Sequence, residues 1–372
     1  MIATVALSHK GTHCSSIFHC KTPENSFSFQ AVLSLPYLDF HMKPNQIISI
    51  CAVALFAFAC GQPTESTNST PAPPPAGQEF MVIGYLPGGR VDTATIQFDL
   101  LTHINFAFAI PQKTGGGLAA LRNADKLKAL VSKAHANNVK VFISIGGWGI
   151  GDGGGDDSRF HRLAADPEER DYFVSKTMEL VRRFDLDGVD VDWEYPDIEN
   201  RSAEDNVLLM RQLRDSLHAA NKKLTAAVVH YGNQGEGTLD EIFEIVDWLN
   251  LMAYDDDKGQ PIPHSPYSLA EKSINYWVKE RGLPAHKTVL GLPFYGKPRR
   301  QNLSHYKDLL AAGADPMKDE FDSVYYNGIE TIQRKTKLAV AEGLSGVMIW
   351  EISQDTHDDN SLLKAINDAA RK

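Results

Sequence analysis

Three acidic residues stand at every second position of the stretch Asp187 to Pro196, which reads DGVDVDWEYP. They are Asp190, Asp192 and Glu194, and apolar residues alternate with them. Because alternate side chains of a β-strand share a side, the spacing predicts a strand with three carboxyl groups on one face. Neighbouring carboxyl groups cannot all ionise, so at least one should keep its proton near neutral pH. A carboxylic acid in that state can protonate a leaving oxygen, and the pattern therefore predicts acid-assisted bond cleavage.

The same stretch resembles the DGxDxDxE signature of glycoside hydrolase family 18, the chitinases and their relatives, and the following Tyr195 is typical of the chitinase branch. The resemblance implies a retaining mechanism in which the substrate's own 2-acetamido oxygen attacks the anomeric carbon. It makes Glu194 the general acid/base. It also implies that Asp192 orients the acetamido group and stabilises the oxazolinium intermediate, while Asp190 supports Asp192 by sharing a proton with it.

Other segments resemble further motifs of that family, among them GYLP, SIGGW, LMAYDD, GLPFYG and GVMIWE. The resemblance implies that Tyr85 and Ser144 hydrogen-bond near Asp190, and that Tyr254 and Asp255 position the N-acetyl group. A flat indole suits the apolar face of a sugar ring. The resemblance also makes Tyr254 a catalytic residue beside the three acids. The residues expected to bind substrate are Tyr85, Ser144, Gly147, Trp148, Tyr195, Met252, Asp255, Tyr295 and Trp350.

Eight short apolar runs, separated by amphipathic stretches, should position these residues. The runs are Met81 to Leu86, His103 to Ala109, Val139 to Ile145, Gly188 to Glu194, Leu224 to His230, Trp248 to Tyr254, Val289 to Phe294 and Gly346 to Trp350. Helices are expected after an N-cap at Asp166 and from Ser202 to Lys222. This alternation predicts an α/β fold, a (β/α)8 TIM barrel over residues 80–372, with catalytic residues at the C-terminal ends of the strands. Only about 50 residues separate Gly296 from the last strand, so no sizeable α+β insertion is expected.

The segment ahead of the barrel predicts export. Residues 1–41 show no usable periodicity and are expected to be a mis-assigned upstream extension, with Met42 as the start. Residues 42–60 have a charged start, an apolar run and small residues before Cys60, the layout of a signal peptide with a lipobox-like cysteine. The run is shorter than the roughly 20 residues that span a bilayer. Residues 61–79 form a Pro/Ser/Thr-rich linker. We expect lipidation at Cys60 and a place at the bacterial cell envelope, with plain secretion as the alternative.

Composition excludes several classes of function. The net charge of -10 argues against nucleic acid as a partner. The histidines lack metal-ligand spacing and the glycine-rich loop at residues 149–154 continues into Asp156 and Asp157, which would repel phosphate, so no metal, nucleotide or other cofactor is expected. The four cysteines all precede residue 61. We expect a monomer whose partner is an N-acetylglucosamine-containing polysaccharide or oligosaccharide, with membrane contact only through a lipid anchor.

The resemblance implies cleavage of β-1,4 linkages in N-acetylglucosamine polymers, as in a chitinase. Two alternatives within the enzyme class are an endo-β-N-acetylglucosaminidase acting on N-glycans and a hydrolase of peptidoglycan sugars. A third alternative is a non-catalytic chitinase-like lectin, in which the terminal glutamate of the acidic motif is usually replaced. Glu194 is present in this chain, which favours an enzyme.

Overall fold

The computed structural model describes residues 16–21, 26–31, 79–151, 155–299 and 304–371. The chain divides into two compact units, residues 1–68 and residues 69–372, and each is described by itself. In the first unit, β1 (Ser16–Lys21) pairs antiparallel with β2 (Ser26–Ala31). The sequence showed no usable periodicity in this region. The pairing is nevertheless compatible with SFSFQA, whose alternation of serine and phenylalanine covers too few residues to have been separated from chance.

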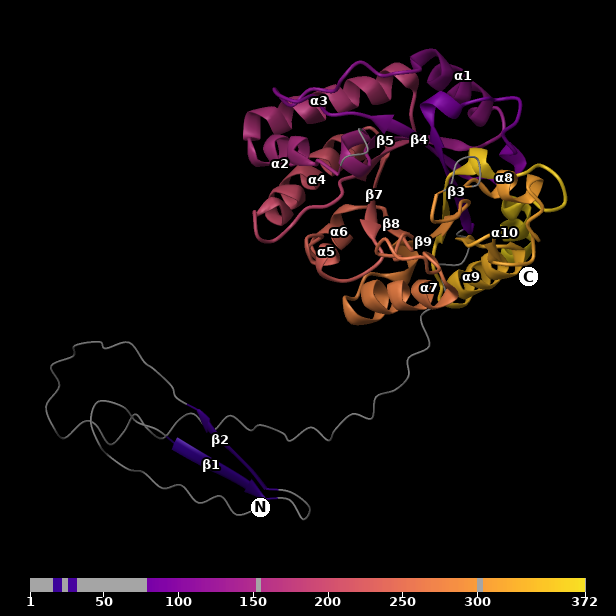
Figure 1. Cartoon of the computed structure of the whole chain (residues 1–372). Helices are drawn as coiled ribbons and strands as arrows, with labels where there is room; N and C mark the ends of the chain where they lie inside the picture. The colour runs from indigo at the N-terminus through magenta and orange to yellow at the C-terminus, as the bar shows by residue number, and fades with distance from the viewer. Residues whose placement is uncertain (1–15, 22–25, 32–78, 152–154, 300–303, 372) are drawn as a thin grey trace, which may run out of the picture. The chain divides into compact units, whose positions relative to one another are not determined.

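The second unit is built around a closed parallel barrel of eight strands (Figure 1). The strands are β3 (Met81–Pro87), β4 (His103–Ala109), β5 (Lys140–Gly146), β6 (Gly188–Asp192), β7 (Lys223–Val229), β8 (Trp248–Met252), β9 (Thr288–Pro293) and β12 (Gly346–Trp350). The last strand pairs with the first, Gly346 opposite Met81, and this pairing closes the ring. The predicted (β/α)8 barrel is confirmed.

Helices surround the strands on the outside of the ring, as Figure 1 shows. They are α1 (Ala124–His135), α2 (Ser158–Ala165), α3 (Pro167–Phe184), α4 (Ser202–Ala219), α5 (Asn233–Glu236), α6 (Ile242–Ile245), α7 (Tyr267–Ile274), α8 (Tyr306–Ala311), α9 (Ile329–Ala341) and α10 (Leu362–Ala370). The start of α3 is the one predicted, because the Asp166 carboxylate accepts the backbone N–H groups of Glu168 and Glu169 at 2.9 and 3.0 Å.

The side chains of β6, together with Trp193 directly after it, separate two layers of packing. Val189, Val191 and Trp193 belong to the large core between the strands and the helices. The Trp193 ring stacks on Phe160 of α2, with centroids 5.1 Å apart. The prediction that Trp193 packs against helices is therefore confirmed, and the intervening acids must face the inside of the barrel.

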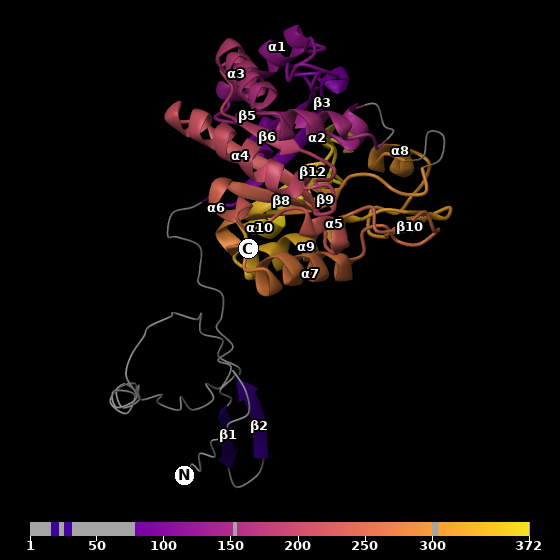
Figure 2. The same cartoon turned by 90° about the vertical axis from the view of Figure 1, so that its left-hand side faces the viewer.

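The connection from β9 to β12 adds little to the barrel. Its described residues hold α8, a two-stranded ladder of β10 (Glu320–Phe321) with β11 (Val324–Tyr325), and α9. Figure 2 shows α8 and β10 at the same end of the barrel. This short ladder agrees with the expectation that no sizeable α+β insertion is present.

The predictions for the export segment fall on residues that lie outside the described part of the chain. These are the start at Met42, the signal peptide, the lipidated Cys60 and almost all of the linker. Among the described residues, no helix combines the length and the apolar character that a bilayer crossing requires.

Candidate active site

The row of acids lies at the C-terminal end of β6. Asp190 and Asp192 belong to the strand and are 0% and 4% exposed. The sequence analysis placed Glu194 inside the strand, but β6 ends at Asp192 and Glu194 lies two residues beyond it. The physical reason is the loss of partners, since the pairing with β7 stops at Val191 and the pairing with β5 stops at Asp192. Glu194 therefore stands on the loop at the mouth of the barrel.

Asp190 is held by four donors from four different strands. Its Oδ2 accepts the hydroxyl groups of Tyr85 and Ser144 at 2.7 and 2.8 Å. Its Oδ1 accepts the Thr225 hydroxyl at 2.6 Å and the Asn250 amide at 3.0 Å. Burial raises the pKa of Asp190, and the four hydrogen bonds oppose that rise. The predicted contacts of Tyr85 and Ser144 with Asp190 are confirmed.

Thr225 and Asn250 were missed in the sequence analysis. Each is the single uncharged polar residue in an otherwise apolar stretch of strand, Thr225 in KLTAAVV and Asn250 in WLNLM. That signal could have marked both as residues with a polar partner in the barrel interior, because buried polar groups are almost always hydrogen-bonded.

Asp192 lies between the other two acids and is less well satisfied. Its Oδ1 is buried and has no hydrogen-bond partner among the described residues. Burial raises the pKa of Asp192 well above its usual range, and the charges of Glu194 and Asp190 add to the rise. The arrangement therefore favours a protonated Asp192 beside an Asp190 that four donors stabilise.

Glu194 is set up to exchange a proton near neutral pH. Burial raises the pKa of Glu194 to about 7, and the charge of Asp255 adds to the rise. A hydrogen bond with the Tyr195 side chain acts in the opposite direction. A carboxylic acid with a pKa in this range can both give and take a proton under physiological conditions.

The residues after β8 bring a fourth carboxyl group, that of Asp255, to the same end of the barrel. Tyr254 is buried, and its hydroxyl lies 3.8 Å from the sulfur of Met348. The Asp255 side chain is 44% exposed, and its Oδ1 accepts the Tyr295 hydroxyl at 2.6 Å. Burial raises the pKa of Asp255, but hydrogen bonds from His264 and Tyr295 and the charge of Lys297 outweigh it and hold that pKa well below its usual range. Asp255 is therefore an anion beside the proton-bearing Glu194.

Trp350 and its aromatic neighbours lie across the barrel mouth from the acids, because β12 and β6 are on opposite sides of the ring. Trp350 ends β12, and its ring centroid lies 5.7 Å from that of Tyr85 and 5.7 Å from that of Phe108. The Phe108 ring is nearly parallel to the indole, with 22° between the planes, and was not predicted. Trp148, which follows β5, is 53% exposed. Both tryptophans are thus available as flat surfaces for a ligand at the C-terminal end of the barrel.

Gly146 and Gly147 bring the loop after β5 close to the acids. Their φ angles of 119° and 90° are in the left-handed region that favours glycine. The backbone N–H of Gly147 donates to the carbonyl oxygen of Asp192 at 2.8 Å. Side chains at these positions would meet the Asp192 carbonyl and the Phe108 ring. The two glycines therefore fix the end of β6. Met252, the remaining predicted residue, is buried in the interior cluster with Tyr254 and Tyr295.

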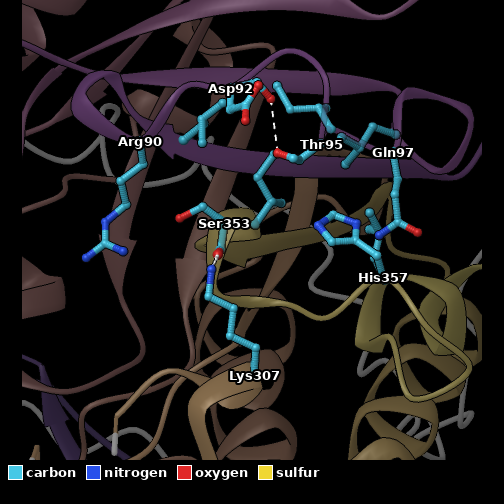
Figure 3. A pocket seen from close by; sticks show the side chains of 12 residues that line it. Arg90, Asp92, Thr95, Gln97, Lys307, Ser353 and His357 are labelled. Carbon is cyan, nitrogen blue, oxygen red and sulfur yellow. Dashed lines mark hydrogen bonds between the residues drawn. The ribbon is translucent and has the colours of Figure 1, made fainter. Parts of the chain in front are cut away.

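A separate pocket of about 360 Å³ lies between the segment after β3 and the segment after β12 (Figure 3). Its lining residues are Leu86, Arg90, Asp92, Thr95, Ile96, Gln97, Leu101, Lys307, Ile352, Ser353, His357 and Leu363. Asp190, Asp192 and Glu194 are not among its lining residues. Its two longest cations are already engaged, since Lys307 donates to the Ser353 carbonyl at 2.6 Å and Arg90 lies 3.7 Å from Glu351. The pocket is therefore distinct from the row of acids.

The barrel region of the chain matches a known protein family. The family model described as glycosyl hydrolases family 18 matches residues 81–355. The chain belongs to glycosyl hydrolases family 18. The match begins at β3 and ends just after β12, so the family 18 region contains the whole barrel. Within the described residues, no cluster of three or more histidine, cysteine, aspartate or glutamate side chains could hold a metal ion.

Proteins similar to this chain include chitinases and a chitinase-like agglutinin. Endochitinase 1 of Metarhizium robertsii is 28% identical over 63% of this chain, and the chain spans 66% of that relative's length, just under two thirds. The crystal structure of the chitinase ChiB from the chitin utilization locus of Flavobacterium johnsoniae has a TM-score of 0.69 and 29% identity, and the likeness covers 79% of this chain and 94% of ChiB. A chitinase-like agglutinin from Robinia pseudoacacia has a TM-score of 0.67 and 26% identity over 77% of this chain and 99% of the agglutinin.

Proposed function

We propose that this chain is a chitinase, a glycoside hydrolase that cleaves β-1,4 linkages between N-acetylglucosamine units of chitin or chito-oligosaccharides. The observation that carries the proposal is Glu194, a carboxylic acid with a pKa of about 7 at the mouth of a family 18 barrel, next to the buried pair Asp190 and Asp192. A lectin has no need of a poised proton donor. The named chitinases among the relatives support the same reaction.

In the proposed mechanism Glu194 protonates the glycosidic oxygen as the bond to the leaving sugar breaks, and two successive inversions at the anomeric carbon give net retention. The acetamido oxygen of the substrate attacks the anomeric carbon and forms an oxazolinium ion. Glu194, now a carboxylate, then takes a proton from the water that opens this ion. A pKa near 7 suits both half-reactions, since the group must be protonated in the first and ionised in the second.

Asp192 orients the acetamido group in this proposal and stabilises the positive charge of the intermediate. Asp190 supports it from inside the barrel. Because four donors already stabilise the anion of Asp190, the proton that the pair shares resides on Asp192 before the substrate binds. The approach of a positive charge favours transfer of the shared proton from Asp192 to Asp190, and the resulting Asp192 carboxylate acts electrostatically in the transition state.

The remaining residues bind the sugar in this proposal. Tyr254 and Asp255 position the N-acetyl group, and Trp350 lies under the sugar ring at the point of cleavage. Trp148 and Tyr195 contact the neighbouring sugar units of the substrate. Tyr85 and Ser144 are fully buried and bonded to Asp190, so they contribute by holding that carboxylate.

The test is product analysis of N-acetylated chito-oligosaccharides incubated with the chain and with its Glu194→Gln variant. Mass spectrometry gives the product lengths and rapid chromatography separates the anomers. We expect products that start as the β-anomer and that disappear in the variant. Intact oligosaccharides with both proteins would overturn the chitinase proposal. The same assay on N-glycoproteins and peptidoglycan fragments then tests the two other hydrolases, and binding without cleavage indicates a lectin.

We also propose, from the sequence alone, that the protein acts as an exported monomer anchored through a lipid at Cys60. The mass of the mature N-terminal peptide after expression in a bacterium tests this. A diacylglyceryl cysteine at position 60 supports the anchor. A free N-terminus elsewhere in residues 42–79 supports plain secretion.

A further inference from the structure

Asp255 has a backbone conformation that is uncommon for a residue with a side chain. Its φ angle is 64°, in the left-handed region, which glycine adopts freely and aspartate adopts more readily than most other residues. Such a conformation costs free energy and persists only where the surroundings impose it. A residue beside a catalytic acid that is held in this way depends on the groups that hold it.

In the described part of the chain, the partners of the Asp255 carboxylate all contact one of its two oxygens. Oδ1 accepts from Tyr295 at 2.6 Å and lies 3.3 Å from Lys297 Nζ. It also lies 3.3 Å from Nδ1 of His264. Oδ2 has no hydrogen-bond partner within the part of the chain that the structure describes. With the side chain 44% exposed, the free oxygen is the one that can accept a hydrogen bond from a ligand.

His264 contacts Asp255 and Tyr295 at the same time, and its side chain is 1% exposed. Its Nε2 lies 3.3 Å from the backbone carbonyl oxygen of Tyr295. Its Nδ1 lies 3.4 Å from the backbone nitrogen of Asp255, in addition to the contact with Oδ1. One buried ring therefore links the backbone and the carboxylate of Asp255 to the strand end that supplies Tyr295.

The chemistry of the imidazole ring keeps this link in either protonation state. A carbonyl oxygen only accepts, so Nε2 carries a hydrogen and donates to Tyr295. In the neutral ring Nδ1 is an acceptor for the N–H of Asp255, and in the charged ring it donates to Oδ1. Both arrangements tie Asp255 to the ring, the first through its backbone and the second through its side chain.

The position of the ring is itself fixed by the next residue. Ser265 donates its hydroxyl to the carbonyl of Ala253 at 2.6 Å. The buried ammonium group of Lys335 on α9 donates to the Ser265 carbonyl and hydroxyl oxygens, each at 2.7 Å, and to Asn327 at 2.7 Å. His264 therefore lies on a loop that is anchored both to the end of β8 and to α9.

We propose that His264 is a positioning residue, which holds Asp255 in its left-handed conformation with one oxygen bound and the other directed at the sugar. The inference rests on the proposed function in one respect, namely that Asp255 contacts the N-acetylglucosamine unit at the point of cleavage. In this proposal the buried ring does not touch the substrate and acts through the Asp255 carboxylate.

Two substitutions separate the two ring nitrogens. In His264→Asn the amide nitrogen lies close to the place of Nδ1 and keeps a polar contact with Asp255, whereas in His264→Gln the amide reaches the place of Nε2 only. We expect kcat/KM of the full chain on N-acetylated chitotetraose to fall about 10²-fold in His264→Gln, as for other small misplacements at a reacting centre, and at most about tenfold in His264→Asn. His357→Gln, at an exposed histidine outside the site, is the matched control and should leave kcat/KM unchanged.

A double-mutant cycle with Asp255→Asn tests whether His264 acts through Asp255. If it does, His264→Gln should add less than about threefold to the loss in a protein that already carries Asp255→Asn. Equal losses in both backgrounds would mean that His264 only stabilises the fold, and would overturn the inference. Equal losses in His264→Asn and His264→Gln would also overturn it.

A binding measurement keeps the inference apart from the proposed reaction. Calorimetry with chitotetraose, in proteins that carry Glu194→Gln, gives the dissociation constant without turnover. If the unsubstituted chain cleaves nothing but binds, the chitinase proposal fails, while weaker binding in His264→Gln supports the inference and unchanged binding overturns it. If the chain cleaves and His264→Gln cleaves equally well, only the inference fails. With neither cleavage nor binding, both fail.

Discussion

The Tyr85 hydroxyl donates to Oδ2 of Asp190 at 2.7 Å, although the two residues are 105 positions apart in the chain. This contact crosses the inside of the barrel from β3 to β6. Ser144, Thr225 and Asn250 reach the same carboxylate from β5, β7 and β8. The most deeply buried acid of the site is thus held by donors from four of the eight strands, which connects the stability of the barrel to the state of this proposed catalytic group.

Loss of one of these donors should destabilise the protein. Thr225→Val keeps the shape of the side chain and removes the hydroxyl that lies 2.6 Å from Asp190 Oδ1. Because the carboxylate stays buried, we expect the free energy of unfolding, measured in urea, to fall by about 1–3 kcal/mol. Thr177→Val is the matched control, since the Thr177 hydroxyl is buried and has no hydrogen-bond partner among the residues that the structure describes, so its removal should be neutral or stabilising. Equal effects of the two substitutions would contradict the role given to Thr225.

The pH dependence of the reaction should follow Glu194. The acid must be protonated to cleave the bond, so kcat/KM should fall about tenfold per pH unit above a midpoint near pH 7. The hydrogen bond with Tyr195 lowers the pKa of Glu194, and removal of the hydroxyl in Tyr195→Phe should move the midpoint to higher pH. Tyr172→Phe, on the exposed surface of α3, serves as the control. A midpoint that moves to lower pH in Tyr195→Phe would show that the phenol has a different effect on the acid.

Truncation of two tryptophans should affect different properties, activity for Trp350 and stability for Trp193. Trp350→Ala removes the surface proposed to lie under the sugar, and we expect kcat/KM to fall at least about tenfold, a typical loss for an aromatic anchor. Trp193→Ala removes a ring that stacks on Phe160 in the outer core, and the free energy of unfolding should fall by about 3–5 kcal/mol. Paired measurements of unfolding and kinetics on both variants check the contrast. A large kinetic effect confined to Trp193→Ala would mean that the wrong indole has been assigned to the substrate.

Gly146 should not tolerate a side chain. A Cβ atom there would lie 2.1 Å from the carbonyl oxygen of Asp192, and the φ angle of 119° is unfavourable for alanine. We expect Gly146→Ala to lower the thermal midpoint and to reduce activity together, because the clash moves the end of β6. Gly89→Ala, where nothing lies within 4 Å of the added atom, should change the free energy of unfolding by less than about 0.5 kcal/mol. Normal activity in Gly146→Ala would show that the strand end relaxes without cost.

The sequence predicted the parts of this protein that follow from periodicity. The eight strands and the row of acids come from runs in which apolar residues recur with a period that local physics dictates. The cap at Asp166 was equally local, since the residue and the N–H groups that it accepts are neighbours in the chain. Motif resemblance supplied the residues that no periodicity marks, such as Tyr85 and Ser144.

What the sequence did not predict depends on the register of the closed barrel. Thr225 and Asn250 meet Asp190 only because the strands shift past each other by particular amounts around the ring. His264 lies on an irregular loop, where no period indicates which side chain will turn inward. The strand was predicted to extend to Glu194, two residues too far. The length of β6 is set by where the pairing with its neighbours stops and not by its own alternating residues.

The pairing of Gly346 with Met81 has a consequence for how this protein reaches its working form. Tyr85 is supplied by the first strand of the ring and Trp350 by the last, and their rings meet across that seam. Contacts between such distant segments are entropically costly to form and tend to arise late in folding. The floor of the proposed sugar site is therefore completed when the first and last strands pair. A chain that has not finished folding should not yet bind the proposed substrate.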